Sequence, residues 1–112
     1  MKPARAASLY EQGSMALNGK QKRQLRALGH HLSAVVLVGS DGVTEGVIGA
    51  VTQALKDHEL IKVKIAEEDR EGRKASVQKL VEGSASEVAQ TMGRTVLLFK
   101  QKKKNSKIAL VK

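Results

Sequence analysis

Two glycines three positions apart, Gly39 and Gly42, are the residues of this chain best suited to ligand chemistry. Neither has a Cβ, so the backbone between them can turn sharply and approach a ligand closely. An amphipathic segment follows from Val43, and the first N–H groups of a helix are unpaired and carry partial positive charge. We therefore expect the turn Gly39, Ser40, Asp41 and Gly42 to bind an anion such as a phosphate.

Neighbouring residues narrow the chemistry of this turn. Asp41 and Glu45 would repel a phosphate unless they cap the helix or pair with a lysine. The turn lacks the Lys-Ser/Thr ending of a P-loop and the third glycine of a dinucleotide-binding loop. It is a G-x-x-G motif of the kind that clamps an RNA backbone in KH-type domains, and it needs basic residues nearby.

Such basic residues occupy a helix predicted over residues 18–29. Asn18 is a suitable N-cap, and Leu25 and Leu28 form a short apolar stripe. Like charges four positions apart cost an isolated helix roughly a few tenths of a kcal/mol each. The basic face is therefore either solvated or matched by an anionic partner, and its cations are Lys20, Lys22, Arg23 and Arg26.

Three histidines are present, and none belongs to a recognisable metal motif. The chain has no cysteine and no carboxylate at a supporting spacing, so we expect neither a metal nor another cofactor. His58 ends the second predicted helix, where a cation suits the helix dipole. Either His30 or His31 is expected to help line the basic face, and Arg94 and Lys100 join the candidate binding residues by their charge and position.

The net charge of +9 is unevenly distributed. Residues 1–40 carry six basic and one acidic side chain, residues 41–93 carry seven and ten, and residues 94–112 carry seven and none. Basic ends around an acidic middle are typical of a protein that binds a polyanion, although they also serve solubility. Anchors for a membrane surface and a signal peptide are both missing, so we expect a cytoplasmic protein.

Enzymatic chemistry is not indicated. No serine has a G-x-S-x-G context, and the acidic run 67–71 is typical of a solvated loop. Tyr10 and Phe99 are the only aromatic residues. Domains that stack bases on a sheet need several exposed rings, so gripping of the RNA backbone is the remaining mode.

A short predicted sheet positions these groups. Residues 35–38 are expected to form a buried strand before the glycine turn, with a helix after it. Residues 60–66 alternate, so that Lys62 and Lys64 point away from the apolar face. Strand, helix and strand in sequence imply a parallel pair with a right-handed crossover.

Further glycines predict contacts and ends of elements. Gly46 and Gly49 are expected to mark a close approach of the second helix to a neighbour. A third helix over 73–82 is expected to stop at Gly83. Gly93-Arg94 predicts a hairpin whose second strand is 95–100. Its unbroken apolar run 96–99 predicts that this strand is buried on both faces or central, whereas 86–92 is either the first strand or more helix.

The chain divides into three expected parts. Residues 1–14 are an extension, either an artificial leader or a natural one. Residues 15–100 form a single domain. Residues 101–112 are a basic tail, which either adds a short strand or stays mobile.

Several stretches together resemble the bacterial YhbY-like proteins, which are stand-alone CRM domains. They are Lys20-Gln21-Lys22, Leu25 to His30, Val35 to Gly39, Gly42 to Val47, Ala54-Leu55, His58 to Ile65 and Gly93 to Leu98. The sequence departs from relatives at Gly29 and Ala34, where alanine and proline are common; these changes affect a helix end and a turn.

The resemblance implies an α/β fold, a compact α-β-α-β-α-β-β domain with a mixed four-stranded sheet, similar to the C-terminal domain of translation initiation factor three. It also implies an RNA-binding protein that binds precursor rRNA of the large ribosomal subunit and assists ribosome assembly, and we expect it to be a monomer. The family's G-x-x-G loop falls on the glycine turn, and its basic surface on the first helix. The alternative is a protein-interaction module that docks on a ribosomal protein or assembly factor. On the RNA-binding hypothesis, the glycine turn and the basic helix are expected to lie side by side and to hold the RNA jointly.

Overall fold

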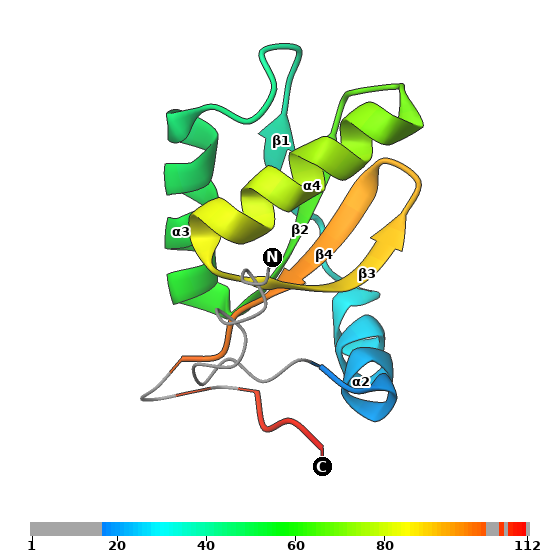
Figure 1. Cartoon of the computed structure of the whole chain (residues 1–112). Helices are drawn as coiled ribbons and strands as arrows, with labels where there is room; N and C mark the ends of the chain where they lie inside the picture. The colour runs from blue at the N-terminus through cyan, green and yellow to red at the C-terminus, as the bar shows by residue number, and fades with distance from the viewer. Residues whose placement is uncertain (1–16, 103–105, 107, 112) are drawn as a thin grey trace, which may run out of the picture.

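The computed structural model describes residues 17–102, 106 and 108–111, so the expected extension 1–14 lies outside it. The elements follow the predicted order (Figure 1). They are α2 (Gly19–Gly29), β1 (Ala34–Val38), α3 (Glu45–His58), β2 (Leu60–Ile65), α4 (Arg70–Ser84), β3 (Glu87–Met92) and β4 (Thr95–Phe99).

The four strands form one mixed sheet in the order β1-β2-β4-β3. β1 and β2 are parallel, as the strand-helix-strand pattern predicted, and the other two pairs are antiparallel. The predicted hairpin joins β3 to β4, and Gly93 in its turn has φ +55°. The sequence-based fold class is confirmed.

Each face of the sheet has its own apolar cluster. On one face, Val38, Val63 and Leu98 pack with residues of α3 and α4, the helices that cover this side in Figure 1. On the other face, Leu97 and Phe99 pack with Leu25 of α2. β4 is therefore buried on both faces, as predicted.

Side-chain caps set the starts of the three helices. Asn18 and Gln21 form a capping box on α2, Thr44 caps α3, and Asp69 caps α4. These short polar side chains accept hydrogen bonds from N–H groups that have no partner within the helix.

The predicted roles of three glycines were wrong. α4 continues through Gly83 and ends at Ala85, which adopts the left-handed conformation. A Cβ on Gly83 would lie 2.5 Å from Cδ1 of Ile48, so the close approach of α4 to α3 occurs there. Gly49 faces open space, and Gly46 has only the Thr44 hydroxyl near. Helical spacing of glycines does not reveal which helix contributes the contact.

Of the C-terminal tail, the described residues 101–102, 106 and 108–111 form no strand, and residues 109 and 111 contact α2. Gln24 donates to the Ala109 carbonyl at 2.7 Å and accepts from the Val111 N–H at 2.8 Å. Ile108 and Leu110 contact the cluster around Phe99. Among the residues that the structure describes, no helix has the length and apolar character that crossing a membrane requires.

Glu59 fastens this segment to the sheet. It is completely buried and has φ +64°. Its carboxylate accepts hydrogen bonds from the Lys102 N–H at 2.7 Å and the Ser106 hydroxyl at 2.9 Å. Its own carbonyl accepts from the Lys100 N–H at 2.8 Å.

We expect Glu59→Ala to lower the free energy of unfolding by about 2–3 kcal/mol, because the Lys102 N–H and the Ser106 hydroxyl lose a charged acceptor. Glutamate and alanine both have a Cβ, so the positive φ at position 59 costs the same in the wild-type protein and in the variant. Urea denaturation measures the effect. The exposed Glu82→Ala serves as control, and an equal loss in both variants would contradict this role for Glu59.

Candidate functional site

The glycine turn is tight and exposed. The Gly42 N–H donates to the Gly39 carbonyl at 3.0 Å, and Gly42 has φ +76°. A Cβ at either glycine would meet nothing within 4 Å. Within the described chain, the N–H groups of Ser40 and Asp41 have no hydrogen-bond partner. The turn therefore offers backbone donors that a ligand can approach.

The start of α3 is less open than expected. The Thr44 hydroxyl accepts from the Val47 N–H at 3.2 Å, so one of the free donors is already used. Glu45 occupies the first turn of the helix. In the described residues, neither Asp41 nor Glu45 has an ion pair. Ligand binding at this end would therefore fall to the turn itself, against local negative charge.

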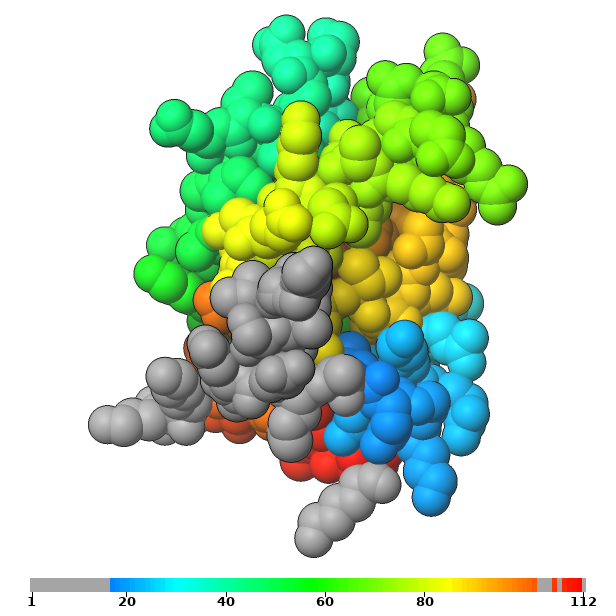
Figure 2. All heavy atoms as spheres, viewed as in Figure 1, coloured from blue at the N-terminus to red at the C-terminus, as the bar shows by residue number. Residues whose placement is uncertain are grey.

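The glycine turn and α2 do not lie side by side, so this prediction was wrong. Figures 1 and 2 show the turn after β1 at one end of the molecule and α2 at the other. The turn follows the carboxyl end of β1. α2 instead packs on Leu60, Leu97 and Phe99, where β2 begins and the antiparallel β4 ends. The length of β1 separates the two.

The cations of α2 form a stripe along one side of the helix. Lys22, Arg26 and His30 are spaced four residues apart, which aligns their side chains. Lys20 and Arg23 are also exposed. No ion pair is made by these residues within the described part of the chain.

The structure brings part of this stripe together with β2. Arg26 and His30 line a hollow of about 370 Å³ with Lys62 of β2 and with Gln90 and Met92 of β3. Two cations from two elements, Arg26 and Lys62, therefore lie around one depression together with the imidazole of His30, the C-cap of α2. Lys62 was predicted to point away from the apolar face, but it was not among the predicted binding residues. The alternation of Lys62 with Ile61 and Val63 was the sequence feature that could have identified Lys62 as a candidate binding residue.

The hollow continues into an uncovered half of the sheet. Lys64 is exposed there, beside Val35 (53% exposed), Leu37 (60%) and Met92 (40%). We call the surface formed by Val35, Leu37, Lys62, Lys64 and Met92 the open face. It extends from α2 toward the glycine turn.

β1 was predicted to be buried. This was wrong for Val35 and Leu37, the side chains that β1 contributes to the open face. Val36 and Val38 pack on the α3 and α4 side, but α2 does not reach Val35 and Leu37. A continuous apolar run shows that a strand can be buried on both faces and does not show that both are covered.

Arg94 lies in the hairpin turn, away from the α2 stripe. Its guanidinium is 3.3 Å from the Glu68 carboxylate, and both side chains are at least half exposed. Its carbonyl accepts from the Ile65 N–H at 2.7 Å, and the next N–H, of Ala66, donates to Val38. Arg94 therefore shares the end of the sheet with the glycine turn.

The histidines do not form a metal site with acidic residues. Across the described residues, no group of three or more His, Cys, Asp or Glu side chains could hold a metal ion. His30 and His31 contact each other edge to face at 5.3 Å. His58 is the last residue of α3, and Glu59 occupies the C-cap position.

Comparison with known proteins gives consistent matches. The family described as CRS1 / YhbY (CRM) domain matches residues 17–100. The "Probable RNA-binding protein PA4753" of Pseudomonas aeruginosa is 42% identical over 93 residues, which cover 83% of this chain and 89% of that protein. The "Probable RNA-binding protein YqeI" of Bacillus subtilis is 42% identical over 94 residues, covering 84% and 98%.

A solved structure has the same fold. The solution structure of the hypothetical protein SAV1595 from Staphylococcus aureus superposes with a TM-score of 0.75 at 33% sequence identity. The match covers 85% of this chain and 99% of that one.

The two glycines of the turn should respond differently to alanine. Gly42→Ala puts a Cβ at φ +76°, which costs about 1–2 kcal/mol of unfolding free energy. Gly39→Ala adds a methyl group in open space without a positive φ, so we expect little change. Thermal or urea unfolding distinguishes them, and equal stabilities would contradict the observed turn geometry.

Proposed function

Because this chain belongs to the CRS1 / YhbY (CRM) domain family, we propose that it is a monomeric, cytoplasmic RNA-binding protein that binds precursor rRNA of the large ribosomal subunit and assists ribosome assembly. The relatives from Pseudomonas and Bacillus are both named as RNA-binding proteins. The assembly role follows from the resemblance to YhbY-like proteins.

One observation carries the proposed binding surface: Arg26 of α2 and its C-cap residue His30 line the same hollow as Lys62 of β2. Cations held together without acidic partners repel one another, and a phosphate backbone would relieve that repulsion. We infer that RNA lies along the α2 stripe and the open face. The predicted residues Lys20, Lys22 and Arg23 contribute from the rest of α2.

The glycine turn would form a second contact further along the RNA. β1 spans about 17 Å, at roughly 3.3 Å per residue, so a chain of several nucleotides could reach from the hollow to the turn. Phosphate there would meet the N–H groups of Ser40 and Asp41. Arg94 lies at the same end of the sheet and would supply positive charge against Asp41.

The open face is suited to sugar and backbone contacts. Phe99, the one Phe, Tyr or Trp among the described residues, is only 2% exposed and cannot stack on a base. The exposed aliphatic side chains can contact ribose and base faces, but they carry no hydrogen-bonding groups to identify a base. RNA shape would therefore dominate selectivity.

We expect Arg26→Gln combined with Lys62→Gln to weaken binding of a large-subunit rRNA fragment and to flatten its salt dependence. Removing two phosphate contacts should make the slope of log K against log salt shallower by about 1.4 for single-stranded RNA. Fluorescence anisotropy at several salt concentrations measures this slope.

The matched control is Lys56→Gln with Lys79→Gln, which removes the same charge from exposed positions on α3 and α4. Equal changes in slope for the two double variants would mean that only net charge matters. The proposed surface would then be wrong.

Crosslinking in living cells tests the assembly role. We expect the protein to crosslink mainly to precursor rRNA of the large subunit, and to sediment with large-subunit intermediates rather than mature ribosomes. Crosslinks mainly to messenger or transfer RNA would contradict the assembly role and leave RNA binding intact.

A further inference from the structure

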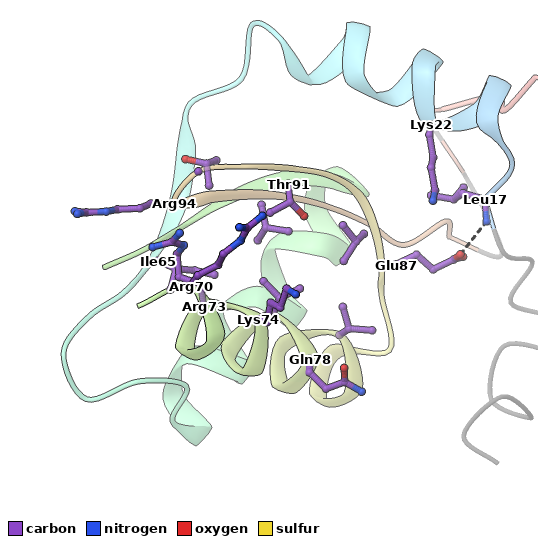
Figure 3. A pocket seen from close by; sticks show the side chains of 16 residues that line it. Leu17, Lys22, Ile65, Arg70, Arg73, Lys74, Gln78, Glu87, Thr91 and Arg94 are labelled. Carbon is purple, nitrogen blue, oxygen red and sulfur yellow. Dashed lines mark hydrogen bonds between the residues drawn. The ribbon is translucent and has the colours of Figure 1, made fainter. Parts of the chain in front are cut away.

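A separate groove lies on the other side of the sheet, between α4 and the β3–β4 hairpin (Figure 3). Its volume is about 1010 Å³. Figure 3 shows side chains of α4 on one side of it and those of β3 and the hairpin on the other. The open face is on the opposite side of the sheet, so the two surfaces are separate except at Lys22 and Arg94, which line the groove and also belong to the proposed RNA path.

The floor of the groove is aliphatic. Val77 and Val81 of α4 face Val88 of β3 and Val96 of β4 across it, with Ile65 of β2 at one end. No aromatic residue is among the described side chains that line it. Val96 and Ile65 are already buried in the core, so a ligand would gain free energy by covering the partly buried Val77, Val81 and Val88.

The rim of the groove is basic and comes from three parts of the chain. α4 contributes Arg70, Arg73 and Lys74, the hairpin contributes Arg94, and α2 contributes Lys22. Glu87 is the one carboxylate among the described lining residues, and it already accepts from the Leu17 N–H at 3.1 Å.

These cations differ in how firmly they are engaged. Arg73 donates to the carbonyls of Glu67 and Glu68, at 3.2 and 2.6 Å, and so holds the loop before α4. Lys74 has only an exposed contact with Glu71 at 4.0 Å, a type of pair that contributes little. Arg70 has no ion pair within the described chain. Arg70 and Lys74 are thus available to an anionic ligand.

We propose that this groove binds an acidic segment of a partner protein, with aliphatic side chains on the valine floor and carboxylates at the basic rim. Charge complementarity requires an anion, and the floor requires apolar side chains on the same ligand. A phosphodiester backbone supplies negative charge but no apolar side chains. The described lining of the groove also contains no aromatic ring on which a base could stack. The protein would then connect RNA on one face to a protein on the other.

Labelled peptides of about twelve residues test this directly. The probe alternates glutamate and valine, and two comparison ligands are a polyglutamate and an oligouridylate of the same length. Anisotropy at about 50 and about 200 mM salt compares their affinities. We expect the glutamate–valine peptide to bind several-fold more tightly than polyglutamate, because only it fills the floor. Equal binding of both peptides, or of neither, would overturn the proposal.

Variants then locate the site. Arg70→Gln with Lys74→Gln should weaken peptide binding about fivefold and leave rRNA affinity nearly unchanged. Lys56→Gln with Lys79→Gln, which removes the same charge, should change neither the peptide affinity nor the rRNA affinity. If the groove variant instead lost oligouridylate binding alone, the groove would be an RNA surface and the proposal would be wrong.

Amide chemical-shift mapping of the unaltered protein provides an independent readout. We expect the peptide to shift resonances of Val77, Val81, Val88 and Thr91, which line the groove. Shifts confined to α2 and the open face would overturn the proposal even if the peptide bound. RNA binding by the protein would stand in either case.

Discussion

The burial of β4 on both faces is the constraint on which the rest of the domain depends. Val96 and Leu98 pack beneath α3 and α4, and Leu97 and Phe99 pack beneath α2. Burying each such side chain contributes about 1.5–3 kcal/mol, so a sheet with one bare face would forfeit much of its stability. α2 is therefore part of the core as well as a carrier of basic residues, and its position is determined by where β4 needs cover.

That requirement also explains why the open face exists. α2 has 11 residues, about 16 Å of helix, and covers only the half of the sheet where β4 ends. Gly29 lets it approach closely, since a Cβ there would lie 2.7 Å from a Leu97 methyl group. Beyond α2, Lys62 and Lys64 occupy this face of the sheet. Apolar side chains at these positions would need a further helix or strand to cover them. The uncovered half thus combines positive charge with exposed aliphatic side chains.

The C-terminal segment secures this arrangement from outside. Gln21 and Gln24 bind its backbone, and Glu59 anchors its start to the junction of α3 and β2. α2 is consequently held between the sheet and a segment about eighty-five residues away in sequence. A basic stripe held on both sides presents its charges in a constant geometry, which lowers the entropic cost of binding a polyanion.

Local sequence determined the elements. The Asn18 cap, the alternation in β2 and the Gly93-Arg94 turn each act over a few residues, so these features and the two-sided burial of β4 could be predicted from local sequence. Residues 86–92 stayed open between strand and helix, and the full order α-β-α-β-α-β-β came from the family resemblance. The tertiary structure decided what covers each surface. Val35 and Leu37 are exposed, and Gly83 rather than Gly49 lies at the contact between α3 and α4. α2 packs one strand length away from the glycine turn. Periodicity reveals which side chains a segment can bury, whereas the partner that buries them depends on contacts between segments far apart in the chain. For the same reason, helical spacing predicted that Lys22 and Arg26 share a face of α2. Only the packing placed Arg26 beside Lys62, and it placed Lys22 at the edge of a different groove.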